Sequence, residues 1–274
     1  RVLLGVLVGA SLSTAGAAFQ GMLRNPMADP YILGISSGAA LGASISIVFN
    51  LDVQILGFST IAVFAFMGGL ATVFIVYNIA KVKQKVPITT LLLSGVAVGQ
   101  FLTAIMSFLM VIYSRDMNKI IYWTLGSLAG KGWEPLMRIS VPIILSIIAM
   151  NFFARDLNIM LIGDESAHSL GVEVEKNKLF ILILGTFMTS MVVSISGIIG
   201  FVGLIIPHIV RIIVGPDHRI LLPSSGLIGG IFMIFADTIA RTIISPMEIP
   251  VGIITAMFGG PFFIYLLRKR KKSV

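Results

Sequence analysis

The charged and polar residues that could do chemistry in this chain are few and far apart. Asp237 and Arg241 lie four residues apart in an apolar stretch, so on one helix they would share a face and could pair. Pairing offsets the roughly 2.5–3.5 kcal/mol that a lone charge costs at the centre of a membrane. We therefore interpret Asp237 and Arg241 as a structural ion pair near the outer end of a helix. His208 follows Pro207 at the end of another apolar stretch, where packing or helix capping is more common than proton transfer.

The sequence lacks the residue patterns of ATP hydrolysis, metal binding and nucleophilic catalysis. Its nearest approach to a phosphate-binding loop, at residues 126–132, is one residue short and has no hydroxyl to hold magnesium. The three histidines form no metal-spaced cluster, and the absence of cysteine excludes disulfides and thiolate zinc sites. We predict no catalytic residue, no metal site and no cofactor, so little supports an enzyme.

The amino-acid composition indicates whether these residues lie in a water-soluble protein or in a membrane protein. The chain of 274 residues is 57% hydrophobic and only 12% charged, with a mean hydropathy of +1.01. A soluble domain carries about 25% charged residues, and a water-soluble globule of this size could not hide so much apolar surface. The chain is therefore predicted to be an integral membrane protein.

The apolar stretches between charged residues predict nine transmembrane helices in one domain, residues 1–274. A crossing needs about 20 apolar residues. The stretch at 179–210 is too long for one helix, and its glycines at 197 and 200 predict a break there. We expect an all-α multi-helix bundle whose spans lie in residues 2–23, 30–51, 53–80, 86–114, 139–154, 179–210 (two helices), 220–236 and 249–267.

Lysine and arginine predict the orientation, because cytoplasmic loops are enriched in them. Most of the 20 lie on one side of the predicted spans: Arg24, Lys81, Lys83, Lys85, Arg155, Lys176, Lys178, Arg211, Arg219 and the tail at 268–272. The C-terminus is then cytoplasmic and Arg1 is outside, which predicts one further helix upstream and ten in the whole protein. The net charge of +8 thus reflects the basic residues of the cytoplasmic loops and tail. We expect the protein to contact membrane lipid and not to bind nucleic acid.

Pairs of glycine at four-residue spacing predict close helix packing. Small residues let backbones approach each other in lipid, where no hydrophobic force drives helices together. The pairs are Gly5/Gly9, Gly38/Gly42, Gly95/Gly99 and Gly226/Gly230.

The longest predicted cytoplasmic loop, residues 156–178, contains a short amphipathic helix in our interpretation. Asp164 could cap it, Glu165 suits its positive N-terminal end, and Gly171 would end it. Ala167 and Leu170 would share an apolar face that needs cover from a protein groove or from lipid headgroups. Acidic residues are at least as numerous here as basic ones, which favours a protein partner over anionic lipid.

Distinctive motifs occur along the whole chain and are densest in its C-terminal half. They are the sequences at 7–10, 15–20, 24–30 (Arg-Asn-Pro-Met-Ala-Asp-Pro), 33–39, 91–97, 122–126, 163–171, 200–208 (Gly-Phe-Val-Gly-Leu-Ile-Ile-Pro-His), 211–223, 236–241, 248–256 and 261–262. With these motifs the chain resembles the FecCD permease family, the membrane subunits of ABC importers for ferric siderophores, haem and vitamin B12.

The resemblance implies a homodimer in the bacterial cell (inner) membrane, two ABC ATPase subunits below it and an extracytoplasmic binding protein above it. A coupling helix in the ATPase cleft would comprise Gly163, Asp164, Glu165, Ser166, Ala167, His168, Leu170 and Gly171. A cytoplasmic gate would comprise Ile88, Thr89 and Thr90. Arg1 and Arg241 match outward arginines that pair with glutamates of the binding protein. A plain interfacial anchor is the alternative for Arg1, and pairing of Arg241 with Asp237 is compatible with docking.

The resemblance therefore implies a permease subunit that imports a ferric siderophore and is driven by the separate ATPase. Import of vitamin B12 or haem through the same framework is the first alternative. An ion-coupled secondary carrier is a second alternative, which the scarcity of intramembrane carboxylates and histidines disfavours.

Overall fold

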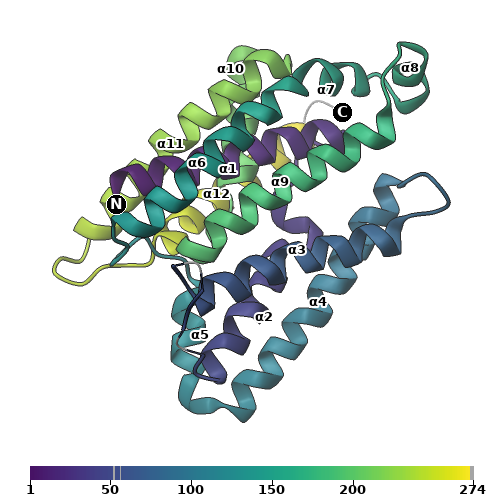
Figure 1. Cartoon of the computed structure of the whole chain (residues 1–274). Helices are drawn as coiled ribbons and strands as arrows, with labels where there is room; N and C mark the ends of the chain where they lie inside the picture. The colour runs from purple at the N-terminus through teal and green to yellow at the C-terminus, as the bar shows by residue number, and fades with distance from the viewer. Residues whose placement is uncertain (52, 56, 272–274) are drawn as a thin grey trace.

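The computed structural model describes residues 1–51, 53–55 and 57–271. These residues form a bundle of helices and one small antiparallel hairpin, β1 (Gln54–Ile55) with β2 (Phe58–Ser59) (Figure 1). Lys272, the last basic residue of the predicted tail, lies outside the described residues.

Nine helices lie where the sequence predicts spans. They are α1 (Val2–Met22), α2 (Ile35–Val48), α3 (Thr60–Ala80), α4 (Ile88–Ile112), α6 (Trp133–Phe152), α9 (Val174–Ser196), α10 (Val202–Val214), α11 (His218–Thr242) and α12 (Val251–Lys271). Shorter helices connect them: η1 (Pro30–Leu33), η2 (Ser114–Asp116), α5 (Met117–Thr124), α7 (Ala154–Met160) and α8 (Asp164–Ser169).

Within the described residues, six helices are long and apolar enough to cross a membrane: α1, α3, α4, α6, α9 and α11. The apolar parts of α2, α10 and α12 are shorter. The chain is thus a multi-pass membrane protein, while the count of nine crossings stays a prediction.

Two span boundaries differ from the sequence prediction for local reasons. The helix predicted at 139–154 begins at Trp133 and ends at Phe152, because its first turns include the charged residues Glu134 and Arg138, which pair four residues apart on the helix. The stretch predicted at 53–80 starts with the hairpin, and α3 begins only after Ser59, whose hydroxyl accepts a hydrogen bond from the backbone N–H of Ala62.

The break predicted inside 179–210 is confirmed. Helix α9 ends at Ser196, and Gly197 takes a φ of +69°, in the left-handed region that glycine favours. A Cβ at Gly197 would lie 2.2 Å from the carbonyl oxygen of Trp123, so the position also admits no side chain. Phe201 then starts α10 with a φ of +68°.

Helix α1 runs through the middle of one half of the bundle, where it packs against α9, α10 and α11, and α2 packs against α3 and α4 in the other half (Figure 1). Glycines make the closest contacts. A Cβ at Gly9 would lie 2.0 Å from the carbonyl oxygen of Gly229 in α11, and one at Gly42 would lie 2.1 Å from that of Phe64 in α3. The predicted close packing is confirmed for Gly9 and Gly42, whereas a Cβ at Gly5 or Gly99 would meet its nearest neighbour only at 3.4 or 3.5 Å.

Helix α4 is the least covered of the long helices. Only 11% of its most apolar window is buried, compared with 72% for α1. Its exposed side chains are large and apolar, and Phe101, Phe108 and Val111 are each more than 60% exposed. Lipid or another protein chain must cover such a surface in the membrane.

Candidate functional site at the two ends of the bundle

The segments predicted to be cytoplasmic meet at one end of the bundle, which we call the α8 end. In Figure 1 it lies on the right, with α7, α8 and the α3–α4 turn, whereas the N-terminus and the α11–α12 loop lie on the left. Polar contacts tie these segments together: Arg24 Nη2 to Asp164 Oδ1 (3.1 Å), Lys178 Nζ to Asp164 Oδ2 (2.6 Å), Val86 N to Glu175 Oε2 (2.9 Å) and Asn158 Nδ2 to Asp217 Oδ1 (2.6 Å). Four predicted loops therefore form one surface.

Helix α8 occupies the middle of the predicted loop 156–178. That loop is shorter in the structure, because α7 covers its beginning and α9 starts at Val174. Gly163 precedes α8 with a φ of +132°, and Gly171 follows it with a φ of +84°. Asp164 and Glu165 lie in the first turn, where carboxylates suit the helix N-terminus.

The two apolar residues of this segment point to different surroundings. Ala167 is fully buried within the chain itself, so its side chain is already covered. Leu170 lies beyond the last helical residue, Ser169, and is 62% exposed. Ile162, just before α8, is 68% exposed. Within residues 162–170, the exposed apolar side chains are therefore Ile162 and Leu170, while Ser166 and His168 are exposed polar neighbours.

Helix α7 is held to the start of α11 by a cluster that sequence reasoning missed. The side-chain oxygen of Asn158 accepts a hydrogen bond from the backbone N–H of His218 (2.9 Å), and its amide donates to Asp217. Asp217 also accepts from the backbone N–H of Arg219, and these bonds to its charged form lower the pKa of its carboxyl group. The partners are about 60 residues apart in sequence, so no local pattern could have found them.

A second cluster, also missed, centres on Lys178 of α9. Its side chain is only 9% exposed, and its ammonium group lies 2.6 Å from Asp164 Oδ2 and 3.0 Å from Glu175 Oε1. A buried charge needs such partners, because its desolvation is otherwise expensive. Glu175 in turn accepts the bond from Val86 N–H at the α3–α4 turn.

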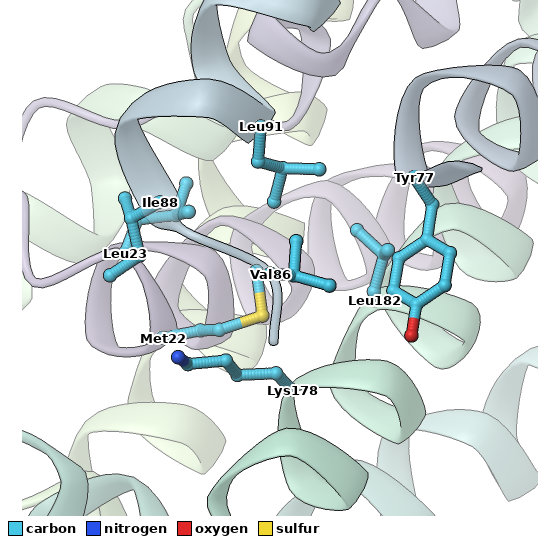
Figure 2. A pocket seen from close by; sticks show the side chains of 8 residues that line it. All are labelled: Met22, Leu23, Tyr77, Val86, Ile88, Leu91, Lys178 and Leu182. Carbon is cyan, nitrogen blue, oxygen red and sulfur yellow. The ribbon is translucent and has the colours of Figure 1, made fainter. Parts of the chain in front are cut away.

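The residues predicted as a gate form the first turn of α4, which begins at Ile88 after Pro87. Thr89 is exposed, and Ile88 and Thr90 are half-buried. Ile88 lines a narrow apolar cavity beside the α8 end. Figure 2 shows that cavity, with the side chain of Lys178 extending beneath Met22 and Val86; it is lined by Met22, Leu23, Tyr77, Val86, Ile88, Leu91, Lys178 and Leu182.

Arg1, Asp237, Arg241 and Glu248 form an ion cluster at the opposite end of the bundle, which we call the Arg1 end. Arg1 contacts Asp237 through Nε (3.1 and 3.0 Å) and Nη2 (2.9 Å), and its Nη1 lies 2.7 Å from Glu248 Oε2. The predicted pair of Asp237 with Arg241 is present but longer, at 3.6 Å. Arg1 is thus the main partner of Asp237, and Arg241 has the more exposed side chain, at 40% against 21%.

Comparisons with known proteins identify a family and relatives that match nearly the whole chain. The model of the FecCD transport family matches residues 1–269. Similar curated proteins include the cobalamin import system permease protein BtuC of Halobacterium salinarum (47% identity, covering 99% of this chain and 72% of the relative) and the Fe(3+) dicitrate transport system permease protein FecD of Escherichia coli (37% identity, covering 97% and 82%).

A solved structure described as an inward-facing conformation of a metal-chelate type ABC transporter superposes with a TM-score of 0.87 at 34% identity. The match covers 98% of this chain and 85% of that one. The family model and these relatives match nearly the whole of this chain. The chain therefore belongs to the FecCD transport family.

Proposed function

We propose that this chain is the membrane subunit of an ABC importer in the bacterial cell (inner) membrane, with its C-terminus and the α8 end in the cytoplasm. The observation that carries the proposal is the α8 end itself. Four segments are tied together there around a short helix that is flanked by two exposed apolar residues, Ile162 and Leu170. The sequence contains no nucleotide-binding loop of its own, so in this proposal a partner bound at this end supplies the energy of ATP hydrolysis.

The proposed assembly contains two copies of this chain, two ABC ATPase subunits and an extracytoplasmic binding protein. The exposed apolar side of α4 supports the second copy, because this helix leaves large side chains such as Phe101 and Phe108 uncovered. The segment from Gly163 to Gly171 would serve as the coupling helix for the ATPase. Ile88, Thr89 and Thr90 would form the cytoplasmic gate, and Arg1 and Arg241 would receive the binding protein.

A bulky metal chelate is the proposed substrate class, with a ferric siderophore as the first candidate. The name of the Escherichia coli relative, a ferric dicitrate permease, supports an iron chelate. Cobalamin is the second candidate, because the relative with 47% identity is named as a cobalamin permease. Haem is the third substrate that the family resemblance implies.

Transport by the reconstituted complex tests this function. Proteoliposomes that hold the permease, its ATPase and its binding protein should accumulate a radiolabelled ferric siderophore or cobalamin only when ATP is inside. Accumulation of one chelate and not the other would identify the substrate. Uphill uptake by the permease alone, driven by a proton or sodium gradient, would instead establish a secondary carrier.

Reversal of charge at Arg241 should weaken docking of the binding protein. Arg241→Glu replaces an exposed cation by an anion that repels the partner's glutamates, so we expect about tenfold weaker binding at low salt, mainly through slower association. The difference should shrink as salt screens the charges. Surface plasmon resonance at several salt concentrations measures this, and Lys119→Glu, an exposed cation of α5, is the charge-matched control. Unchanged affinity for Arg241→Glu would exclude the docking role.

A single cysteine at Thr89 should report movement of the proposed gate. The chain has no cysteine, so Thr89→Cys introduces the only thiol. We expect its rate of maleimide labelling in the full complex to change at least threefold between nucleotide-free and ATP-bound states, because Thr89 is exposed in the first turn of α4, the element proposed to move. A labelling rate that is identical in both states would remove Thr89 from the gate.

A further inference from the structure

We propose that Lys178 is a positioning residue that connects the coupling helix α8 to the first turn of α4. The observation behind it is a continuous polar path: Asp164 of α8 to Lys178, Lys178 to Glu175, and Glu175 to the backbone N–H of Val86. Val86 lies two residues before α4 begins at Ile88. This inference rests on the proposed function, because it takes α8 as the element that the ATPase moves and α4 as the element that opens.

The path is the polar connection between these two elements. Among the hydrogen bonds of the described residues, the bond from Val86 to Glu175 is the one that joins the α3–α4 turn to the beginning of α9. The same acidic residue of α8 also holds Arg24, which follows α1, so α8 is fixed on two sides. Asp164 is thus the residue through which a displacement of α8 would reach both Arg24 and Lys178.

The cation at the centre of this path is buried, whereas its two carboxylate partners, Asp164 and Glu175, are 40% and 33% exposed. The Lys178 side chain is 9% exposed, and its methylene stem lies in the apolar cavity with Met22 and Val86 (Figure 2). A buried ammonium group that loses a carboxylate partner is left uncompensated, which is strongly unfavourable. When Asp164 moves, Lys178 and Glu175 must follow it or the ion pair must break, and either event changes the support of Val86. An exposed ion pair could exchange its partner for water and would transmit much less.

Lys176 differs from Lys178 in the exposure of its side chain. It lies in the same first turns of α9 and pairs with Glu173, but its side chain is 70% exposed. Lys176→Met is therefore a matched control that removes a cation from the same helix without breaking a buried pair. Lys178→Met keeps the apolar stem and removes the charge, and Lys178→Arg keeps the charge.

The test uses the full complex in proteoliposomes with two readouts: the nucleotide-dependent labelling of Thr89→Cys, and the chelate transported per ATP hydrolysed. We expect Lys178→Met to assemble with the ATPase and hydrolyse ATP, to lose most of the nucleotide dependence of labelling, and to transport at least fivefold less chelate per ATP. Lys178→Arg should restore part of both, and Lys176→Met should resemble the wild type. Wild-type values of both readouts in Lys178→Met would overturn the proposal.

Two further arms keep the outcome interpretable. If Lys178→Met fails to assemble, Glu175→Gln takes its place, because a carboxamide oxygen can still accept from Val86 while the charge that faces Lys178 is gone. If labelling at Thr89 does not respond to nucleotide in the otherwise wild-type complex, the proposed gate is wrong, and transport per ATP still decides the role of Lys178. If the wild-type complex shows no ATP-driven transport at all, the proposed function fails rather than this inference.

Discussion

Replacement of Gly9 by leucine is expected to prevent α1 and α11 from packing and to leave little folded protein. A Cβ at this position would lie 2.0 Å from the carbonyl oxygen of Gly229 and 2.7 Å from Cγ of Met233. The nearest obstacle is backbone, which cannot rotate away as a side chain can. Overpacking typically costs about 1–3 kcal/mol in a core, and a leucine against the backbone of a neighbouring helix should exceed that range. Because close contact is what holds helices together in lipid, separation of α1 from α11 is not repaid elsewhere.

The measurement is the fraction of detergent-extracted protein that stays monodisperse after heating, followed by size-exclusion chromatography. Gly9→Ala should fall between the wild type and Gly9→Leu, because its methyl group already meets the Gly229 carbonyl. Gly260→Leu in α12 is the control, since a Cβ there has nothing within 4 Å. A melting temperature for Gly9→Leu equal to that of Gly260→Leu would show that α1 and α11 do not approach as closely as the structure indicates.

The helices were predictable from the sequence because membrane burial leaves a local signature. Length and hydropathy located the stretches that form the nine long helices of the described residues, and the low helix stability of glycine predicted the break at residues 197–200. The small-residue spacing at Gly9 and Gly42 likewise predicted tight packing, although it did not identify the opposing helix. The partner depends on how distant segments meet, and a spacing of four residues carries no such information.

The ion pairs show again that local sequence patterns do not identify partners that are distant in the sequence. The four-residue rule correctly joined Asp237 to Arg241, but the shorter contacts of Asp237 are with Arg1, 236 residues away in sequence. Lys178 was counted only as one more cytoplasmic cation. Its pairing with Glu175, three residues before it, follows the local helix rule. The sequence did not indicate its second partner, Asp164, 14 residues away, or the burial of its side chain. Long-range electrostatic partners follow from the packing of the bundle, so they became visible only in the structure.

The proposed coupling segment, from Gly163 to Gly171, shows where a local rule stops at a helix end. Residues three apart share a face only while the helix continues. Helix α8 ends at Ser169, so Leu170 leaves the face that Ala167 occupies. A charge at Ala167 would therefore disturb the packing of the segment within its own chain. The residue that tests contact with the ATPase is Leu170, whose side chain is free of such packing.

Leu170→Glu is expected to weaken ATPase binding about 100-fold, which corresponds to about 2.7 kcal/mol, and to reduce ATP-driven transport to background. The proposed contact places an apolar side chain in a groove of the partner, and a carboxylate there would lose its water without gaining a counter-charge. Co-purification with a tagged ATPase, followed by titration of the detergent-solubilised subunits, measures the affinity.

Two variants separate this effect from damage to the permease itself. Leu170→Met keeps an apolar side chain of similar volume and should retain most of the affinity. Ala167→Glu places a charge at a fully buried position and should lower the thermal stability of the isolated permease, whereas Leu170→Glu should leave that stability unchanged because the side chain is exposed. A stable Leu170→Glu permease that still co-purifies with a full complement of ATPase would show that the contact lies elsewhere on the α8 end, with exposed Ile162 as the next residue to replace.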